Sequence, residues 1–137
     1  MPTVRVISHA QARRIVDVVT TELESRDLAA AVAVVDPHGE LIAFLRTDGC
    51  PLASIDNAVH KAFTAARERV PSHTLGQRSR DETFPMTNFG DLRYTGWGGG
   101  VPVVSDGSVV GAVGVSGLVE DLDMELANRG AECLDGL

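Results

Sequence analysis

The stretch Gly96–Gly117 reads GWGGGVPVVSDGSVVGAVGVSG and holds eight of the fourteen glycines in the chain. At its centre, Asp106-Gly107 separates two apolar runs, Val101–Ser105 and Ser108–Ser116. Asp-Gly is a strong hairpin signal, because a type I′ turn needs a positive φ at both of its central residues. The stretch therefore predicts a β-hairpin, and the rest of the chain supplies the elements around it.

The second strand of this hairpin is poor in side chains. Strict alternation places Val110, Ala112, Gly114 and Ser116 on one face, and Val109, Gly111, Val113 and Val115 on the other. Glycine inside a strand often marks a place where another backbone or a ligand comes close. We therefore expect a helix, a second subunit or a ligand to lie directly against the first of these faces.

The segment upstream predicts one helix and a second hairpin. Ser8 and Gln11 can form a capping box, and apolar residues follow at helical spacing as far as Arg26-Asp27. Ala29–Asp36 is apolar on both faces, which is typical of a central strand. The turn Asp36-Pro37-His38-Gly39 has type I chemistry and leads into a second strand, Glu40–Thr47, which should pair antiparallel with the first.

Helices are also predicted on either side of the glycine-rich hairpin. One should begin at Ser54 and stop before Pro71, and another should run from Glu120 to about Leu134. Their inward-facing stripes are Ile55, Ala58, Val59, Ala62, Phe63 and Ala66 in the first, and Met124, Ala127, Ala131 and Leu134 in the second. Residues 72–95 are polar and predict an irregular segment with one short helix inside Ser72–Asp81. Two hairpins with separate helices indicate an α+β fold in one domain, residues 1–137.

Composition excludes several classes of function. The net charge is −7 with an isoelectric point near 4.9, so a nucleic-acid binder or a membrane-surface protein is not expected. The N-terminal segment lacks the apolar run of a secretory signal, and no stretch is long enough to span a membrane. Cys50 and Cys133 are far apart and form no metal-binding motif. We therefore expect reduced thiols and a cytoplasmic location.

The helix that begins at Ser54 carries the densest set of polar residues. Asn57, Lys61, Thr64 and Glu68 follow one line along it, and His60 lies on the neighbouring stripe. One interpretation is an ordinary solvated face. The other is a binding or catalytic face, on which Lys61, next to small residues, is partly desolvated and acts as an acid, a base or an anion anchor.

A second candidate segment, Arg46–Cys50, stands at the end of a predicted strand. Arg46 could hold a carboxylate in bidentate fashion, or it could form a plain surface pair with Asp48. Cys50 would be nucleophilic only if its pKa were lowered. The sequence leaves these alternatives open.

Several well-known motifs are excluded by spacing. Gly96–Gly100 lacks the last glycine of G-x-G-x-x-G and leads into a strand rather than a helix, so it is not a phosphate loop. The four histidines form no zinc motif, and no metal site is expected. Any of them could be an axial ligand to haem, and His60 has the best position. The acids at the start of the last helix are explained by the helix dipole.

Three blocks of sequence resemble the GlcG/HbpS-like family. They are VVDPHGEL at residues 34–41 with RTDG at 46–49, SIDNAVHKAFTA at 54–65, and GGVPV at 99–103 with GAVGVSG at 111–117. The resemblance implies a profilin-like layered α/β sandwich, with an antiparallel sheet of four to five strands flanked by helices. It also implies homo-oligomers from dimer to octamer. Members include haem-binding and haem-degrading proteins and the C-terminal domain of PduO-type proteins.

Two function hypotheses follow. In the first, a haem-like or small aromatic carboxylate ligand binds near the second helix and the glycine-rich hairpin. Its candidate contacts are His60, Asn57, Thr64, Gly99 and Gly100, with Arg46 or Lys61 on the carboxylate. The alternative is a cofactor-free lyase, isomerase or hydratase, in which Lys61, Asp48 and Arg46 carry acid–base chemistry at a subunit boundary. A structural partner module is a third interpretation.

Overall fold

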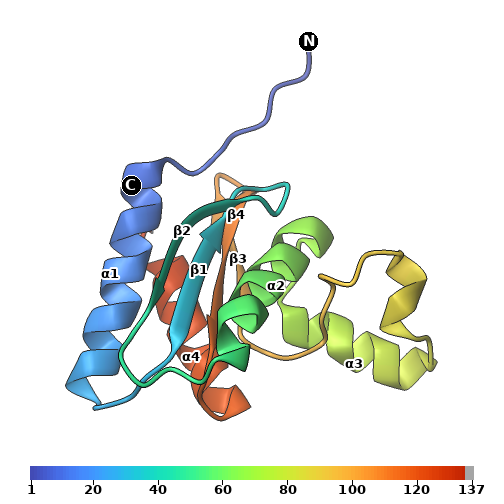
Figure 1. Cartoon of the computed structure of the whole chain (residues 1–137). Coiled ribbons are helices and arrows are strands. Elements are labelled where there is room, and N and C mark those ends of the chain that lie inside the picture. Colours follow the sequence, from blue (N-terminus) through green and yellow to red (C-terminus); the bar gives the residue numbers. More distant parts are fainter. Residues whose placement is uncertain (135–137) are drawn as a thin grey trace.

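Four strands form one antiparallel sheet in the order β2-β1-β4-β3 (Figure 1). The strands are β1 (Ala31–Val35), β2 (Leu41–Arg46), β3 (Gly100–Ser105) and β4 (Ser108–Ser116). The structure is a computed structural model that describes residues 1–134. The predicted α+β class and antiparallel sheet are confirmed. The β1–β2 hairpin and the glycine-rich β3–β4 hairpin join through the β1–β4 ladder at the centre of the sheet.

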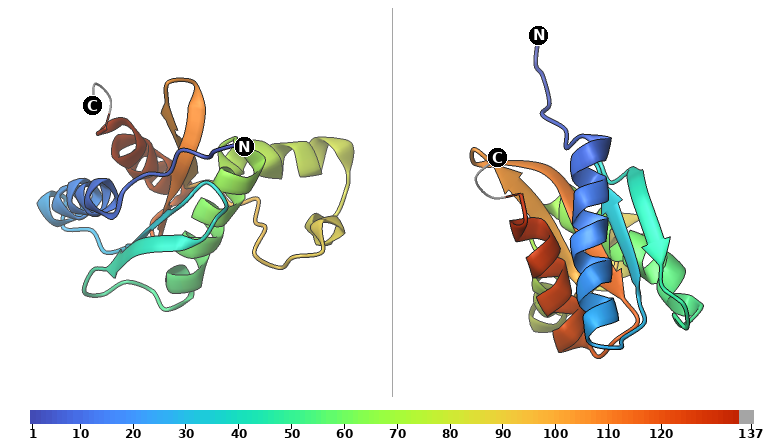
Figure 2. Two further views of the ribbon diagram at one scale, coloured as in Figure 1. Left: turned by 90° about the horizontal axis from the view of Figure 1, so that it is seen from above. Right: turned by 90° about the vertical axis from the view of Figure 1, so that its left-hand side faces the viewer.

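Helices cover both faces of the sheet. α1 (His9–Ser25) and α4 (Glu120–Glu132) lie side by side on one face, and α2 (Ala53–Glu68) lies on the other (Figures 1 and 2). α3 (Ser72–Glu82) and a short 3₁₀ helix (Met86–Phe89) extend beside α2, away from the sheet. The layered sandwich expected from the family resemblance is therefore the observed architecture.

The local signals in the sequence have the predicted geometry. Asp106 and Gly107 have φ values of 50° and 77°, as a type I′ turn requires. The capping box of α1 is present, with Gln11 N–H donating to Ser8 Oγ at 3.1 Å and Ser8 N–H donating to Gln11 Oε1 at 2.9 Å. The β1–β2 turn closes through a hydrogen bond from Gly39 N–H to the Asp36 carbonyl at 3.0 Å.

A β-bulge corrects one prediction for β4. The ladder pairs Val103 with Gly111 and Val104 with Val109, so Val110 is an extra residue. Val110 is buried in the same apolar cluster as Val113 and Val115, on the face covered by α1 and α4. The strict alternation that placed it with Ala112 and Gly114 is wrong, because a bulge shifts the side chains on one side of it to the other face.

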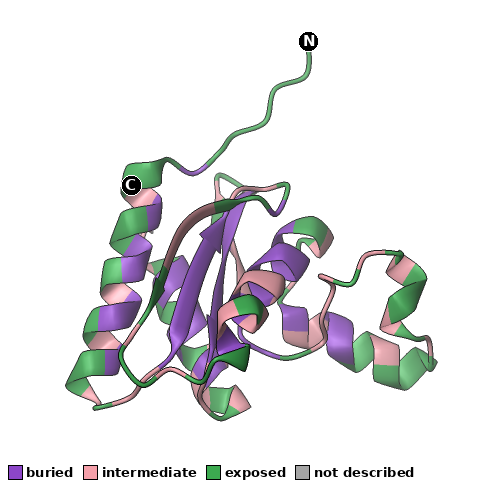
Figure 3. Ribbon diagram, viewed as in Figure 1, coloured by how far each residue is buried: buried purple, intermediate pink, exposed green. Residues whose placement is uncertain are grey.

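The two faces of the sheet differ in how closely a helix approaches. A Cβ atom on Gly114 would overlap the Ala58 carbonyl oxygen and lie 2.8 Å from Ala62 N, so the backbone of α2 rests directly on β4. This interface is made almost entirely of alanine: Ala31, Ala33, Ala58, Ala62, Ala65, Ala66 and Ala112. The opposite interface is filled by larger side chains, among them Ile15, Val19, Leu23, Val113, Val115 and Leu126. The close neighbour of the bare strand face is thus α2 of the same chain, and both interfaces are buried (Figure 3).

Burial along α2 and α4 differs from the predicted stripes. In α2, Ile55 and Val59 are only half-buried, whereas Ser54, Lys61 and Thr64 are buried. α4 ends at Glu132, so Leu134 lies beyond it; Met124 and Leu134 are half-buried, and the buried residues of α4 include Asp123 and Leu126. α2 packs on the sheet with one side, and α3 and the segment leading into β3 cover a second side. A prediction from one amphipathic stripe assumes that only one side of a helix is buried, so it does not detect this second contact.

The two cysteines are not bonded to each other, since no disulfide joins Cys50 to Cys133 in the described part of the chain. Among residues 1–134, no helix combines the length and the apolar character needed to cross a membrane.

Candidate functional site

Lys61 and Asp123 form an ion pair in the interior of the protein. Lys61 Nζ lies 3.0 Å from Asp123 Oδ2 and donates a second hydrogen bond to the Val115 carbonyl at 3.0 Å. Only 4% of Lys61 and 3% of Asp123 are exposed. One ammonium group therefore ties α2 to the end of β4 and to the first turn of α4.

The second oxygen of Asp123 completes this junction. Asp123 Oδ1 accepts a hydrogen bond from Leu118 N–H at 3.1 Å, in the loop between β4 and α4. Burial raises the pKa of Asp123 above its ordinary value, and the charge of Lys61 and the hydrogen bonds from Lys61 and from backbone N–H groups offset part of that increase. Lys61 and Asp123 thus form a desolvated ion pair, and their hydrogen-bonding partners come from this chain.

Three consecutive glycines close this pair off from solvent. A Cβ atom on Gly99 would lie 3.1 Å from Asp123 Cβ and 3.1 Å from Lys61 Cδ, and one on Gly100 would overlap the Lys61 carbonyl oxygen. Gly98, Gly99 and Gly100 are all buried, so they form a cover over the ion pair rather than an exposed rim. Side chains at these positions would displace the segment from α2.

Ser72, the first residue of α3, holds this cover in place. Its hydroxyl donates to the Trp97 carbonyl at 2.7 Å and accepts from Gly100 N–H at 2.9 Å. The same segment is anchored to α2 by Thr64, whose hydroxyl accepts from Thr95 N–H at 3.0 Å. The glycine cover is therefore fixed by hydroxyl groups from two helices.

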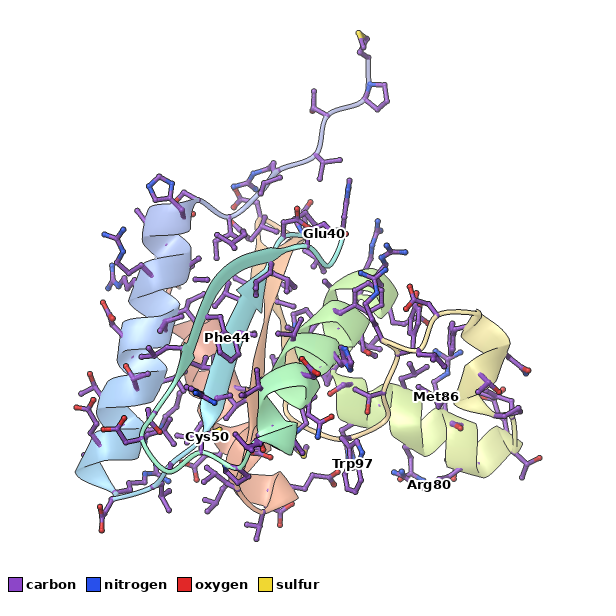
Figure 4. All side chains as sticks on the ribbon, viewed as in Figure 1. Glu40, Phe44, Cys50, Arg80, Met86 and Trp97 are labelled. Carbon is purple, nitrogen blue, oxygen red and sulfur yellow. The ribbon has the colours of Figure 1, made fainter. Side chains whose placement is uncertain are left out.

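The outer side of this segment carries an exposed aromatic ring. Trp97 is 65% exposed, and Figure 4 shows its indole directed away from the sheet. Next to it, Glu120 Oε2 accepts from Gly98 N–H at 2.9 Å, while Glu120 Oε1 lies 3.7 Å from His73 Nδ1. His73 Nδ1 is buried and has no hydrogen-bond partner among residues 1–134. An exposed indole, an imidazole and a carboxylate thus meet at one surface.

The predicted residues of α2 differ in how far they are buried. Thr64 is fully buried, and its hydroxyl also donates to the His60 carbonyl at 2.9 Å. Asn57 and His60 are half-buried. The interpretation of the α2 line as an ordinary solvated face is wrong for Lys61 and Thr64, because the segment before β3 covers them.

The strand-end candidates Arg46 and Asp48 are exposed. Together with Thr47, Gly49 and Cys50 they line a hollow of about 220 Å³. Within residues 1–134 they form no ion pair with each other, so the predicted surface pair is not present. Burial raises the pKa of the Cys50 thiol, Arg46 lowers it and Asp123 raises it, so this hollow is in electrostatic range of the buried pair. A raised pKa is the opposite of what a nucleophilic cysteine needs.

An aromatic cluster anchors the segment that crosses α2. Phe63 is fully buried, with the Tyr94 ring edge-on at 5.2 Å and the Arg93 guanidinium 4.1 Å from its ring centre. Arg93 is held by Asp91 at 2.8 Å, and this hydrogen-bonded pairing lowers the pKa of Asp91 to about 2. The path of residues 91–97 is therefore set by contacts that are specific to the tertiary structure.

The sheet order and the placement of the helices on both faces define a layered α+β sandwich. The chain belongs to the HbpS-like family, because the family model described as haem degrading protein HbpS-like matches residues 7–132. The predicted family resemblance is confirmed.

Individual relatives agree with this assignment. Protein GlcG of Escherichia coli (strain K12) is 34% identical over 122 residues, which cover 85% of each chain. A double mutant of HbpS from Streptomyces reticuli has a TM-score of 0.89 at 30% identity, over 98% of this chain and 90% of that one. The PduOC:heme complex has a TM-score of 0.87 at 21% identity, over 95% and 96% of the two chains, and shows similarity of fold alone.

The sequence did not single out four residues of this site. Asp123 and Glu120 were attributed to the helix dipole, His73 was only one of four possible axial ligands to haem with His60 preferred, and Trp97 was given no role. His73 and Glu120 are 47 positions apart along the chain, so no local spacing could have paired them. The available signal was the glycine content of residues 99–103 and 111–117, which predicts that another part of the molecule packs closely against them.

Proposed function

We propose that this protein binds a haem-like tetrapyrrole or a small aromatic carboxylate on the surface formed by Trp97, His73 and Glu120, beside His60 and Asn57 of α2. The description of the family as haem-degrading supports a haem-related ligand. The observation that carries the proposal is the buried Nδ1 of His73, which has no hydrogen-bond partner in the described part of the chain and lies 3.7 Å from Glu120 Oε1.

The chemistry of these residues fits a haem group. A histidine that ligates a metal usually donates its second ring N–H to a carboxylate, which fixes the orientation of the ring. Glu120 Oε1 lies 3.7 Å from His73 Nδ1, and a small side-chain movement would let it accept that N–H, which would leave Nε2 as the nitrogen to hold iron. Bound haem would supply redox and oxygen chemistry, as it does in other histidine-ligated haem proteins. The exposed indole of Trp97 offers a flat apolar surface to a planar ring.

Lys61 has a different role in this proposal from the one first expected. Its ammonium already holds Asp123 and the Val115 carbonyl beneath the glycine cover. A ligand carboxylate would instead meet the half-buried side chains of Asn57 and His60. Thr64, Gly99 and Gly100 would shape the site from below by fixing the segment that carries Trp97.

Titration of the purified apoprotein with haemin should give a saturable Soret shift at micromolar concentration and quench the fluorescence of Trp97, the only tryptophan in the chain. His73→Ala should weaken binding by about tenfold or more, because it removes the metal ligand. Trp97→Ala should weaken it less, by about the energy of one stacking contact. Absorbance and fluorescence titrations measure both effects.

His38→Ala is the matched control, since His38 lies in the β1–β2 turn and should leave haemin affinity unchanged. His60→Ala separates the two imidazoles on this surface: a larger effect than that of His73→Ala would transfer the axial role to His60. Absence of a saturable shift in the wild-type protein, or wild-type affinity in His73→Ala, His60→Ala and Trp97→Ala alike, would contradict the proposal.

We also propose that the protein assembles as a homo-oligomer. Leu52 and Val119 directly precede α2 and α4 and are 76% and 68% exposed, respectively. Large apolar side chains at helix starts are ready contacts for a second copy. Light scattering on the purified protein would give a mass of at least twice 14.5 kDa, and a monomer at micromolar concentration would reject this assembly.

A cofactor-free enzyme is the second candidate function, favoured by the buried Lys61–Asp123 pair and the raised pKa of Asp123. Arg46 and Asp48 would meet the substrate in their hollow. Because Asp48 is exposed, Asp48→Asn should leave folding intact. It should lower turnover of an isomerase or hydratase substrate by about 100-fold if Asp48 is an acid or base. Unchanged turnover would reject Asp48 in that role.

A further inference from the structure

A second polar hollow lies at the C-terminal end of α2, next to the β1–β2 turn. It has a volume of about 370 Å³ and is lined by Pro37, His38, Arg67 and Arg69. We call it the arginine hollow. None of these residues takes part in the surface formed by Trp97, His73 and Glu120, so the arginine hollow is a separate feature of the molecule.

Arg67 is already oriented in this hollow. Its Nε donates to the His38 carbonyl at 2.8 Å, and its guanidinium carbon lies 4.8 Å from the centre of the buried Phe63 ring. A guanidinium that is held on one edge and one face keeps its remaining N–H groups pointing in a fixed direction. Such preorganisation reduces the conformational entropy that a ligand must overcome on binding.

Arg69 approaches the same hollow from an unusual backbone conformation. It ends α2 with a left-handed φ of 60°, and its N–H donates to the Ala65 carbonyl at 2.9 Å. Glycine is the usual residue at a helix end of this kind, because a side chain is strained there. Arg69 also lines the hollow, so the chain carries an arginine where glycine would be the less strained residue.

The charges of both arginines are uncompensated. Within the described residues, neither Arg67 nor Arg69 forms an ion pair, although the chain as a whole has a net charge of −7. Asp91, whose pKa Arg67 helps to lower, is already held by Arg93.

We propose that the arginine hollow binds a small oxyanion, either a phosphate or a dicarboxylate. Guanidinium groups match both through paired, charge-assisted hydrogen bonds, and Arg67 and Arg69 line this hollow together with His38. The volume suits a ligand of a few heavy atoms and not a tetrapyrrole, which is assigned to the other surface. The inference does not depend on haem binding.

Inorganic phosphate and succinate are the two probes, followed by ¹⁵N amide shifts and by calorimetry of the full-length protein at low salt. Saturable binding of either probe, with the largest shifts at residues 38–39 and 67–69, is the expected result. The probe that saturates at the lower concentration shows whether the hollow prefers a phosphate or a dicarboxylate. No saturable binding of either probe overturns the proposal.

Arg69→Gly is the most informative variant, because glycine adopts a positive φ without strain and the helix end is preserved. It should weaken binding of the preferred probe about tenfold. Arg67→Met should weaken it at least as much, while Arg14→Gln, an exposed arginine of α1 with the same loss of charge, should change it little. Equal affinity in the wild type, Arg69→Gly and Arg67→Met would overturn the proposal, and a haemin titration of Arg69→Gly should match that of the wild type.

Discussion

Lys61→Met lowers the free energy of unfolding by about 3–5 kcal/mol, which is the range expected when one partner of a buried ion pair is removed. The variant leaves Asp123 buried without its ammonium partner, and the Val115 carbonyl loses its donor. The methionine is similar in length to lysine, so the loss reports on charge more than on volume. Urea unfolding followed by circular dichroism measures the difference from the wild type.

The double variant Lys61→Met/Asp123→Asn should recover most of this loss. Asparagine removes the unpaired charge and still offers an oxygen to Leu118 N–H. Arg14→Met is the matched control, an exposed residue for which we expect a change within about 0.5 kcal/mol. If Lys61→Met were as stable as this control, the buried pair would not hold the three elements together.

The loss of unfolding free energy in Lys61→Met should also depend on pH. Without the ammonium, the pKa of Asp123 should rise further above its ordinary value. A carboxyl with a raised pKa in the folded state binds its proton more tightly there than in the unfolded chain, so stability falls as pH rises above about 4. The difference between wild type and Lys61→Met should therefore be smaller at pH 5 than at pH 8.

Gly114→Ala should destabilise the protein by about 3 kcal/mol or more, at the upper end of the range for overpacking. The added Cβ would overlap the Ala58 carbonyl oxygen and approach Ala62 N, which are both backbone atoms of α2. No side chain can rotate away to make room, so the whole helix must move off the sheet. Urea unfolding again gives the magnitude.

Gly130→Ala is the control for this substitution. Its Cβ would lie 3.0 Å from Val19 Cγ2 and 3.1 Å from Ile15 Cγ2, which are methyl groups that can shift slightly. Alanine also favours the helical backbone of α4 by up to about 1 kcal/mol. We expect a net change within about 1 kcal/mol, and equal losses in the two variants would show that backbone contact at Gly114 is not special.

Local sequence was enough to predict the elements of the fold. The capping box at Ser8, the type I turn at Asp36–Gly39 and the Asp106-Gly107 hairpin each depend on a few neighbouring residues. The antiparallel pairing within each hairpin follows from the short turns. The bulge at Val110 escaped prediction, because one extra residue in a strand leaves no mark in an alternating run of small apolar side chains.

The candidate site could be predicted only in part. Lys61 stood out because it emerges beside small residues on α2, but its partner Asp123 is 62 positions further along the chain. The polar line on α2 was ambiguous, since a covered face and a solvated face can have the same composition. Only the segment that crosses α2, fixed by Thr64 and Ser72, decides which of the two it is.

The sequence by itself determined the strands, the helices, the two turns and the family to which the chain belongs, because these depend on local backbone preferences and on short motifs. The tertiary structure decided what the glycines are for. Gly114 admits α2, and Gly99 and Gly100 cover a buried charge pair whose members come from different helices. It also brought Trp97, His73 and Glu120 to one surface, and Arg67 and Arg69 to another. Such contacts depend on distances between remote segments, and a linear sequence does not contain those distances.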